Sequence, residues 1–74
     1  MFEEIKAILV DELEVDAALV SPEAEFIKDL KLNSLEIADL VVLCEEKYGM
    51  GVDEDDIHTI LTVQDLCDYI AAHR

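Results

Sequence analysis

Apolar residues recur at helical spacing near the N-terminus of the chain. Between residues 2 and 14 they follow one another at intervals of three and four, while the acidic residues fall mostly on the other sides. The apolar side consists of Phe2, Ile5, Ile8, Leu9 and Leu13. This pattern predicts an amphipathic helix over residues 2–14 that buries its apolar side.

A second helix is predicted from Asn33 or Ser34 to Tyr48. Either first residue is a good N-cap, because its side chain accepts a hydrogen bond from a free backbone N–H of the first turn. Glu36 then lies at the positive end of the helix dipole, and Gly49 is a typical residue to follow a helix. We expect the inward side to be formed by Leu35, Ala38, Val41 or Val42, and Tyr48.

The C-terminal third of the chain predicts a short helix and a final longer one. One or two helical turns are expected within residues 52–60, with Asp53 as a candidate cap. The final helix begins at Thr62, because Thr62 and Asp65 approximate a capping box, and it is expected to fray over residues 72–74. Its inward residues are predicted to be Val63, Leu66, Cys67 and Ile70.

A long connection joins the first two helices over residues 15–33, with Ser21-Pro22 marking a turn or a brief helical start. A loop of this length in a small domain has to pack against the helices. The expected anchors are Val15, Val20, Phe26, Ile27 and Leu30. The predicted fold is therefore all-α: a single domain over residues 1–74, built as a small antiparallel helical bundle of three main helices and one short helix.

Composition narrows the function. The 74 residues are 53% hydrophobic, enough for a folded bundle but too few for a deep catalytic cleft, which favours a binding or carrier module. The 19 acidic against 5 basic residues give a net charge of −14. This charge argues against nucleic acid and anionic membranes as partners and favours proteins with basic patches. Acidic residues at the N-terminus and the short apolar run 40–44 indicate neither a signal peptide nor a membrane span, so we expect a cytoplasmic protein and, by default, a monomer.

Three candidate sites have simple structural explanations. Cys44 and Cys67 lie within apolar helical patterns, which is typical of reduced core residues. The acidic run 53–56 lacks the alternating ligands, the glycine and the distant glutamate of a calcium loop, so no metal is predicted there. His58 lies in a short acidic segment and is expected to be solvated.

Ser34 is the most informative polar residue, and the residues alone leave its role open. A self-contained hydrolase is not indicated, because there is no G-x-S-x-G motif and the only histidines are His58 and His73. The hydroxyl can act simply as a helix cap. It can also be an attachment point, since a phosphate joined to it lies at the natural anion position of a helix.

The chain resembles the acyl carrier protein family over nearly its whole length. The resemblance rests on the segments FIKDL at 26–30, NSLE at 33–36, LVVLCEEKYGMGV at 40–52 and LTVQDLCDYI at 61–70, which occur in the family's order and at its size. It implies that Ser34 carries 4′-phosphopantetheine, donated by coenzyme A, and that acyl groups are held on this arm as thioesters. The pathway implied is fatty-acid, polyketide or related biosynthesis.

The resemblance also implies a non-catalytic protein that is served by a phosphopantetheinyl transferase and by acyl-transfer, ligase or synthase enzymes with basic patches. The expected partner-binding residues lie on the second helix: Leu35, Glu36, Ile37, Asp39, Val42, Glu45 and Glu46. Ile37 and Val42 are equally compatible with the edge of the core. A short acyl chain is expected among Leu40, Cys44, Ile60 and Leu66.

Two residues depart from the family pattern. Asn33 stands where the family usually has aspartate, and Lys31 stands where glycine is common. These changes remove one negative charge and add a positive one beside Ser34, which suggests a specialised carrier with altered transferase recognition. The alternatives are an acidic protein-interaction module without a prosthetic group, and an aminoacyl or peptidyl carrier domain. The second usually has glycine and histidine near its serine, and neither is beside Ser34 here.

Overall fold

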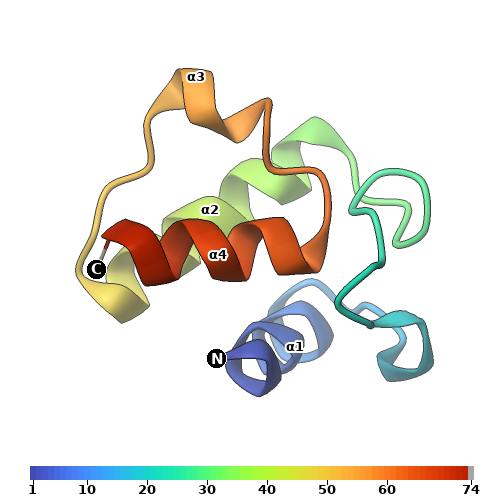
Figure 1. Cartoon of the computed structure of the whole chain (residues 1–74). Helices are drawn as coiled ribbons and strands as arrows, with labels where there is room; N and C mark the ends of the chain where they lie inside the picture. The colour runs from blue at the N-terminus through green and yellow to red at the C-terminus, as the bar shows by residue number, and fades with distance from the viewer. Residues whose placement is uncertain (74) are drawn as a thin grey trace.

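The computed structural model describes residues 1–73 and contains four α-helices within them. The helices are α1 (Phe2–Glu12), α2 (Ser34–Tyr48), α3 (Glu54–Ile57) and α4 (Val63–His73). α1 contacts both α2 and α4, whereas the short α3 lies at the opposite side of the molecule from α1 (Figure 1). α2 and α4 run in the same direction in this view, and α1 is seen nearly end-on. The predicted all-helical bundle is confirmed.

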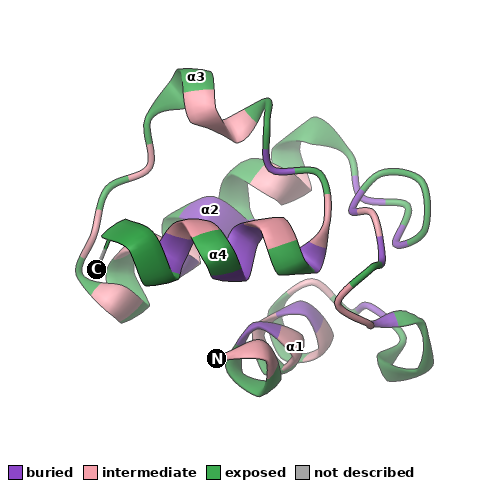
Figure 2. Cartoon of the chain, in the orientation of Figure 1, coloured by how far each residue is buried: buried purple, intermediate pink, exposed green. Residues whose placement is uncertain are grey.

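Residues from all three longer helices form the core (Figure 2). The predicted inward side of α4 is confirmed, because its four apolar residues are buried. On α1, Ile5 and Leu9 are fully buried, and Phe2 and Ile8 pack against the core while partly exposed. Leu13 does the same, but it follows the helix, which ends at Glu12 and not at residue 14 as predicted. Periodicity therefore identified the buried sides of the two terminal helices.

The predicted inward side of α2 was partly wrong. Leu35 is 78% exposed and Ala38 is also exposed, whereas Leu40, Val41 and Cys44 are buried. At 3.6 residues per turn, Leu35 lies about 140° around the helix from Leu40, so the two side chains cannot both face the core. The apolar residues of α2 surround most of the helix, and only packing against α1 and the rest of the core selects which of them are buried.

The connection between α1 and α2 packs as expected except at one anchor. Val15, Val20, Phe26 and Leu30 are buried, but Ile27 is 65% exposed. The Ser21-Pro22 prediction is confirmed as a turn, with the Ala24 N–H bonded to the Ser21 carbonyl at 3.1 Å. A 3₁₀ helix, η1 (Ala17–Leu19), precedes that turn.

Backbone hydrogen bonds attach this connection to the start of α4. The Phe26 N–H donates to the Leu61 carbonyl at 3.0 Å, and the Val63 N–H donates to the Ala24 carbonyl at 3.1 Å. Glu25 and Thr62 form an isolated antiparallel bridge between these two contacts. These bonds hold residues 24–26 of the connection beside the start of α4, from where the chain continues to the start of α2.

Two helix starts in the C-terminal third differ in how they are capped. The capping box at α4 is confirmed, since the Asp65 N–H donates to Thr62 Oγ1 at 3.1 Å and the Thr62 N–H donates to Asp65 Oδ2 at 3.2 Å. Asp53 is the N-cap residue of α3, as predicted, but its side chain makes no capping hydrogen bond. α3 is instead attached to α4 through Tyr69, whose hydroxyl donates to Asp56 Oδ2 at 2.8 Å.

The end of α4 is more regular than predicted. The helix continues through His73, whose ring stacks on Tyr69 with the ring centroids 3.9 Å apart. The expected fraying at residues 72 and 73 is therefore wrong, and Arg74 lies outside the described residues.

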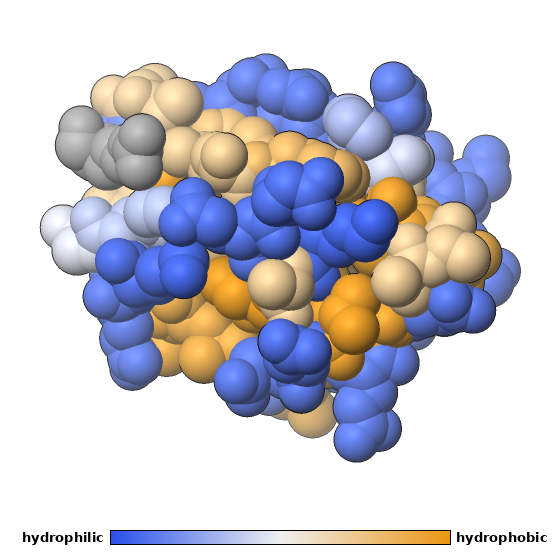
Figure 3. Space-filling model, turned by 90° about the horizontal axis from the view of Figure 1, so that it is seen from below, coloured by the Kyte–Doolittle hydropathy of each residue, from blue (hydrophilic) through white to orange (hydrophobic). Residues whose placement is uncertain are grey.

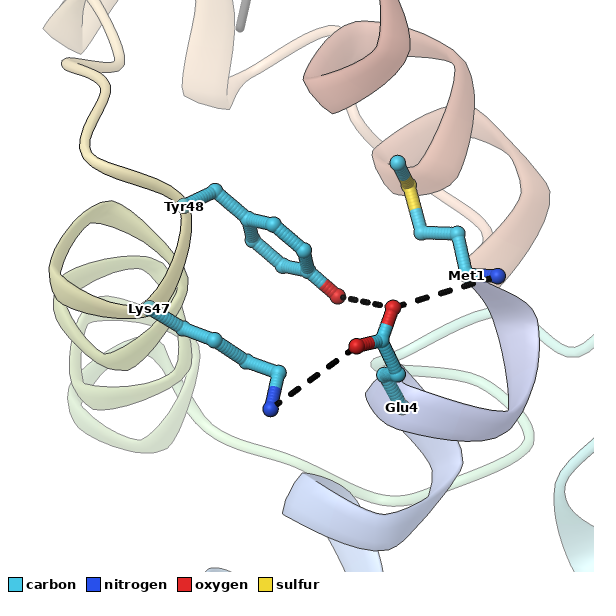
Figure 4. Close-up of polar contacts among 4 residues, drawn as sticks. All are labelled: Met1, Glu4, Lys47 and Tyr48. Carbon is cyan, nitrogen blue, oxygen red and sulfur yellow. Dashed lines mark hydrogen bonds and ion pairs between the residues drawn. The ribbon is translucent and has the colours of Figure 1, made fainter.

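A polar cluster joins the start of α1 to the end of α2 (Figure 4). The Tyr48 hydroxyl donates to Glu4 Oε1 at 3.1 Å, and Lys47 Nζ lies 4.0 Å from Glu4 Oε2. The Met1 amino group is 4.0 Å from Glu4 Oε1. This cluster is solvent-exposed and supplements the apolar contact between the two helices.

Both cysteines are buried free thiols, as predicted. Burial raises the pKa of the Cys44 thiol from 9.0 to about 11, and it also raises the pKa of Cys67. Within residues 1–73 no helix is long and apolar enough to cross a membrane. The same residues contain no cluster of three or more His, Cys, Asp or Glu side chains placed to hold a metal ion.

Candidate functional site

Asn33 is the N-cap of α2. Its Oδ1 accepts the Glu36 N–H at 2.9 Å, and Glu36 Oε1 accepts the Asn33 N–H at 3.1 Å. The sequence left Asn33 and Ser34 as equal candidates, and the structure selects Asn33. The reciprocal bond from Glu36 was not predicted, although an N-cap residue followed three positions later by glutamate is the signature of this capping box.

Ser34 is the first residue of α2, and its side chain is exposed. Its hydroxyl makes no hydrogen bond to any residue in the range 1–73. The interpretation of Ser34 as the N-cap is therefore wrong, because Asn33 performs that role. The backbone N–H groups of Ser34 and Leu35, at the positive end of the helix dipole, are left without intrahelical acceptors. This position suits an anionic phosphate ester on the hydroxyl.

An apolar hollow of about 230 Å³ lies beside Ser34. Its lining residues come from the connection, α2, α3 and the segment before α4: Ile27, Ser34, Ile37, Ala38, Ile57, His58, Ile60 and Leu61. Of the four residues expected around a short acyl chain, Ile60 lines this hollow, whereas Leu40, Cys44 and Leu66 are packed in the core; the place of the acyl chain stays a prediction. The residues that were missed lie on exposed or partly exposed apolar positions, which periodicity does not distinguish from the core.

His58 is exposed, as predicted, and lines the same hollow as Ser34. Among residues 1–73, no hydrogen bond joins its ring to the Ser34 hydroxyl. The site thus presents a serine without an oriented base beside it, whereas nucleophilic catalysis requires such a base.

The outer surface of α2 contains four of the predicted partner-binding residues. Leu35, Asp39, Val42 and Glu46 are exposed. The other three are partly buried: Ile37 lines the hollow, Glu36 belongs to the capping box, and Glu45 Oε2 accepts the Val52 N–H at 2.8 Å. Two of the four predicted carboxylates therefore hold the ends of α2 and are less available to a partner.

Comparison with known proteins agrees with this geometry. The family model described as "Phosphopantetheine attachment site" matches residues 3–70. The acyl carrier protein of Helicobacter pylori (strain G27) is 43% identical over 74 residues, covering 100% of this chain and 95% of the relative. The chain belongs to the acyl carrier protein family. The acyl carrier protein of Nitratidesulfovibrio vulgaris (strain DP4) is 42% identical over 69 residues, which cover 93% of this chain and 91% of that relative.

As an acyl carrier, this chain uses 4′-phosphopantetheine as its prosthetic group. The exposed, unbonded Ser34 hydroxyl at the start of α2 fits the attachment of such a group. The two departures from the family pattern are structurally distinct. Asn33 caps α2 as an aspartate would, whereas Lys31 occupies a left-handed backbone conformation with φ 59°. Glycine is least strained in this conformation, and a non-glycine residue costs about 1–2 kcal/mol there.

Proposed function

We propose that Ser34 is the attachment residue for 4′-phosphopantetheine and that the chain is a single, non-catalytic carrier domain over residues 1–74. The arm would hold acyl intermediates as thioesters for fatty-acid, polyketide or related biosynthesis. The observation that carries this proposal is the position of the Ser34 hydroxyl. It is exposed at the start of α2, it is not used to cap the helix, and it lies within a chain of the phosphopantetheine attachment family.

Loading requires a phosphopantetheinyl transferase and coenzyme A. Ser34 Oγ attacks the phosphorus that bears pantetheine, an Oγ–P bond forms, and the P–O bond to adenosine 3′,5′-bisphosphate breaks. The hydroxyl proton passes to a base on the transferase, because no base is bonded to Ser34 within residues 1–73. The chain's own contribution is to present Ser34 at a helix start whose N–H groups favour the phosphodiester anion.

The exposed residues of α2 support a docking role. Asp39 and Glu46 present negative charge, and Leu35 and Val42 present apolar surface on the same helix. We propose that basic patches on the transferase and on acyl-transfer, ligase or synthase enzymes contact this surface. Such exposed charge pairs speed association more than they strengthen the complex, which suits a cytoplasmic carrier that visits several enzymes in turn.

The hollow beside Ser34 supports a place for a short acyl chain. Its lining is largely apolar, and it contains the attachment residue itself. Residues on its rim, such as Ile27 and Leu61, are exposed and can cover an apolar cargo without disturbing the core.

The experiment is the intact mass of the protein after incubation with coenzyme A and a broad-specificity phosphopantetheinyl transferase. We expect one phosphopantetheine adduct on the wild type and none on Ser34→Ala. The control is Ser21→Ala, which removes the chain's other serine and should leave the adduct in place. A wild type that gains no adduct from any transferase would instead favour the protein-interaction module.

A further inference from the structure

Two lysines beside Ser34 have no partner in the described chain. Lys28 and Lys31 are exposed, and neither lies within ion-pair distance of a carboxylate in residues 1–73. This is notable because the sequence contains 19 acidic residues. Lys6 on α1 is also without an ion pair in these residues, whereas Lys47 lies 4.0 Å from Glu4. We call Lys28 and Lys31 the lysine edge. The connection also contains Asp16, Glu23, Glu25 and Asp29, so this edge consists of two local positive charges and not of a positive surface.

The turn that carries Lys31 is firmly held. Its neighbours Leu30 and Leu32 are buried, and the Leu32 N–H donates to the Phe26 carbonyl at 2.9 Å. Lys31 itself has φ 59°, a conformation that is strained for lysine. Strain of this kind persists only where the surroundings enforce it, and it is frequent at functional sites. The fold thus displays a lysine at a position where glycine would be less strained.

Both lysines lie close to the attachment residue. Ile27 and Ser34 line the same hollow, and Lys28 lines an adjoining hollow that also contains Ile27. Lys31 precedes Ser34 by three residues. An enzyme that acts on Ser34 Oγ must therefore cover this edge. Enzymes that act on the far end of the arm can stand further from it.

We infer that the transferase that loads Ser34 presents carboxylates to Lys28 and Lys31, beside the basic patch that faces α2. This inference rests on the proposed attachment at Ser34. The docking surface consists of the lysine edge, the apolar side chains of Ile27 and Leu35, and the acidic outer surface of α2. Its complement is a bipolar surface with acidic groups next to basic ones. Basic residues placed opposite Lys28 and Lys31 would repel them, so the two lysines also select against a transferase whose docking surface is uniformly basic.

The test uses the phosphopantetheinyl transferase of the organism that makes this chain, with coenzyme A, and measures kcat/KM for loading by intact mass. The variants are Lys28→Glu, Lys31→Glu, the double variant and Lys31→Gln, which removes the charge alone. Lys6→Glu is the matched control, because it makes the same charge change on α1, at a residue that lines neither hollow beside Ser34. Lys31→Gly tests the backbone and should melt no lower than the wild type.

We expect the double variant to lose roughly tenfold in kcat/KM, mainly through KM, as rim charges affect association. Lys31→Gln should lose less, and Lys6→Glu should stay close to the wild type. The differences should disappear near 1 M salt, where the Debye length is about 3 Å. A double variant that loads as fast as the wild type, or faster, would overturn the inference, because a uniformly basic partner predicts acceleration. A wild type that is never loaded would overturn the proposed function itself.

Discussion

Asn33 and Ser34 are neighbours with separate roles at the start of α2. Asn33 forms both bonds of the capping box with Glu36, whereas the Ser34 hydroxyl is exposed and unbonded within residues 1–73. A helix start that depended on the serine Oγ as its cap acceptor would have that bond weakened when the hydroxyl became esterified, because an ester oxygen is a poorer acceptor. Placing the cap one residue earlier allows the hydroxyl to be modified without weakening the helix.

This division predicts opposite results for two alanine substitutions. Asn33→Ala should lower the free energy of unfolding by about 1 kcal/mol, because it leaves the Glu36 N–H without its cap. For a domain of this size, that corresponds to a drop of roughly 4–8 °C in melting temperature. Ser34→Ala should abolish loading while changing the melting temperature little. Urea or thermal denaturation together with intact mass separates the two effects, and a large loss of stability in Ser34→Ala would contradict the division of roles.

Among the elements, α3 depends most on a single side chain. It has four residues, no buried residue and no side-chain cap of its own. Tyr69 on α4 donates its hydroxyl hydrogen to Asp56 and accepts the Asp53 N–H at 3.4 Å. Because Ile57 on α3 lines the hollow beside Ser34, this contact also helps to shape that hollow.

Tyr69→Phe should therefore loosen α3 selectively. The substitution keeps the ring and its stacking on His73 but removes both hydrogen bonds to the α3 region. We expect faster hydrogen exchange of the amides in residues 54–57, with little change for the buried part of α4. His73→Ala is the matched control, since it alters the same stack without touching Asp56. Equal exchange in the wild type and in Tyr69→Phe would show that other contacts hold α3.

The sequence predicted the buried residues of a helix well only where one side of the helix is apolar and the other sides are polar. α1 and α4 each have one apolar side, so their buried residues could be read from spacing. α2 has apolar residues around most of its circumference, and the exposure of Leu35 depends on packing that local spacing does not encode. The hollow beside Ser34 was missed for a related reason. It is formed by residues from four separate segments, and only the fold brings them together.

At the scale of the whole molecule, negative charge opposes folding. The net charge is −14 on 74 residues, and only two ion pairs are found within residues 1–73. Seen from below, the molecular surface is largely hydrophilic, with apolar patches between the polar groups (Figure 3). Repulsion among these charges favours expanded states of the chain.

Added salt should therefore stabilise the protein by screening this repulsion. We expect the melting temperature to rise as NaCl increases from about 10 mM to about 300 mM, a range over which the Debye length shortens from roughly 30 Å to below 10 Å. A non-ionic solute at equal osmolality is the control. A melting temperature that does not change with ionic strength would contradict this account.

Alkaline pH should act in the opposite direction. Burial is the main cause that raises the pKa of Cys44 from 9.0 to about 11 and the pKa of Tyr48 from 10.0 to about 12. The unfolded chain loses these protons first, so the stabilisation is complete below pH 9 and is lost as pH rises through the folded pKa values. Urea unfolding at a series of pH values should show this decline. Cys44→Ala should be less stable overall but should lose less between pH 9 and 11, and an equal loss would exclude the thiol as a cause.

The burial of both cysteines also makes the protein easy to label selectively. Near neutral pH the two thiols of the polypeptide are protonated and enclosed, and are therefore slow to react with maleimide or to form mixed disulfides. A pantetheine thiol at the end of a flexible arm is neither buried nor shifted in pKa by burial, so it would react with maleimide much faster. Alkylation of the native protein would thus count loaded molecules directly, and the growing cargo would have no competing sulfur on its own carrier.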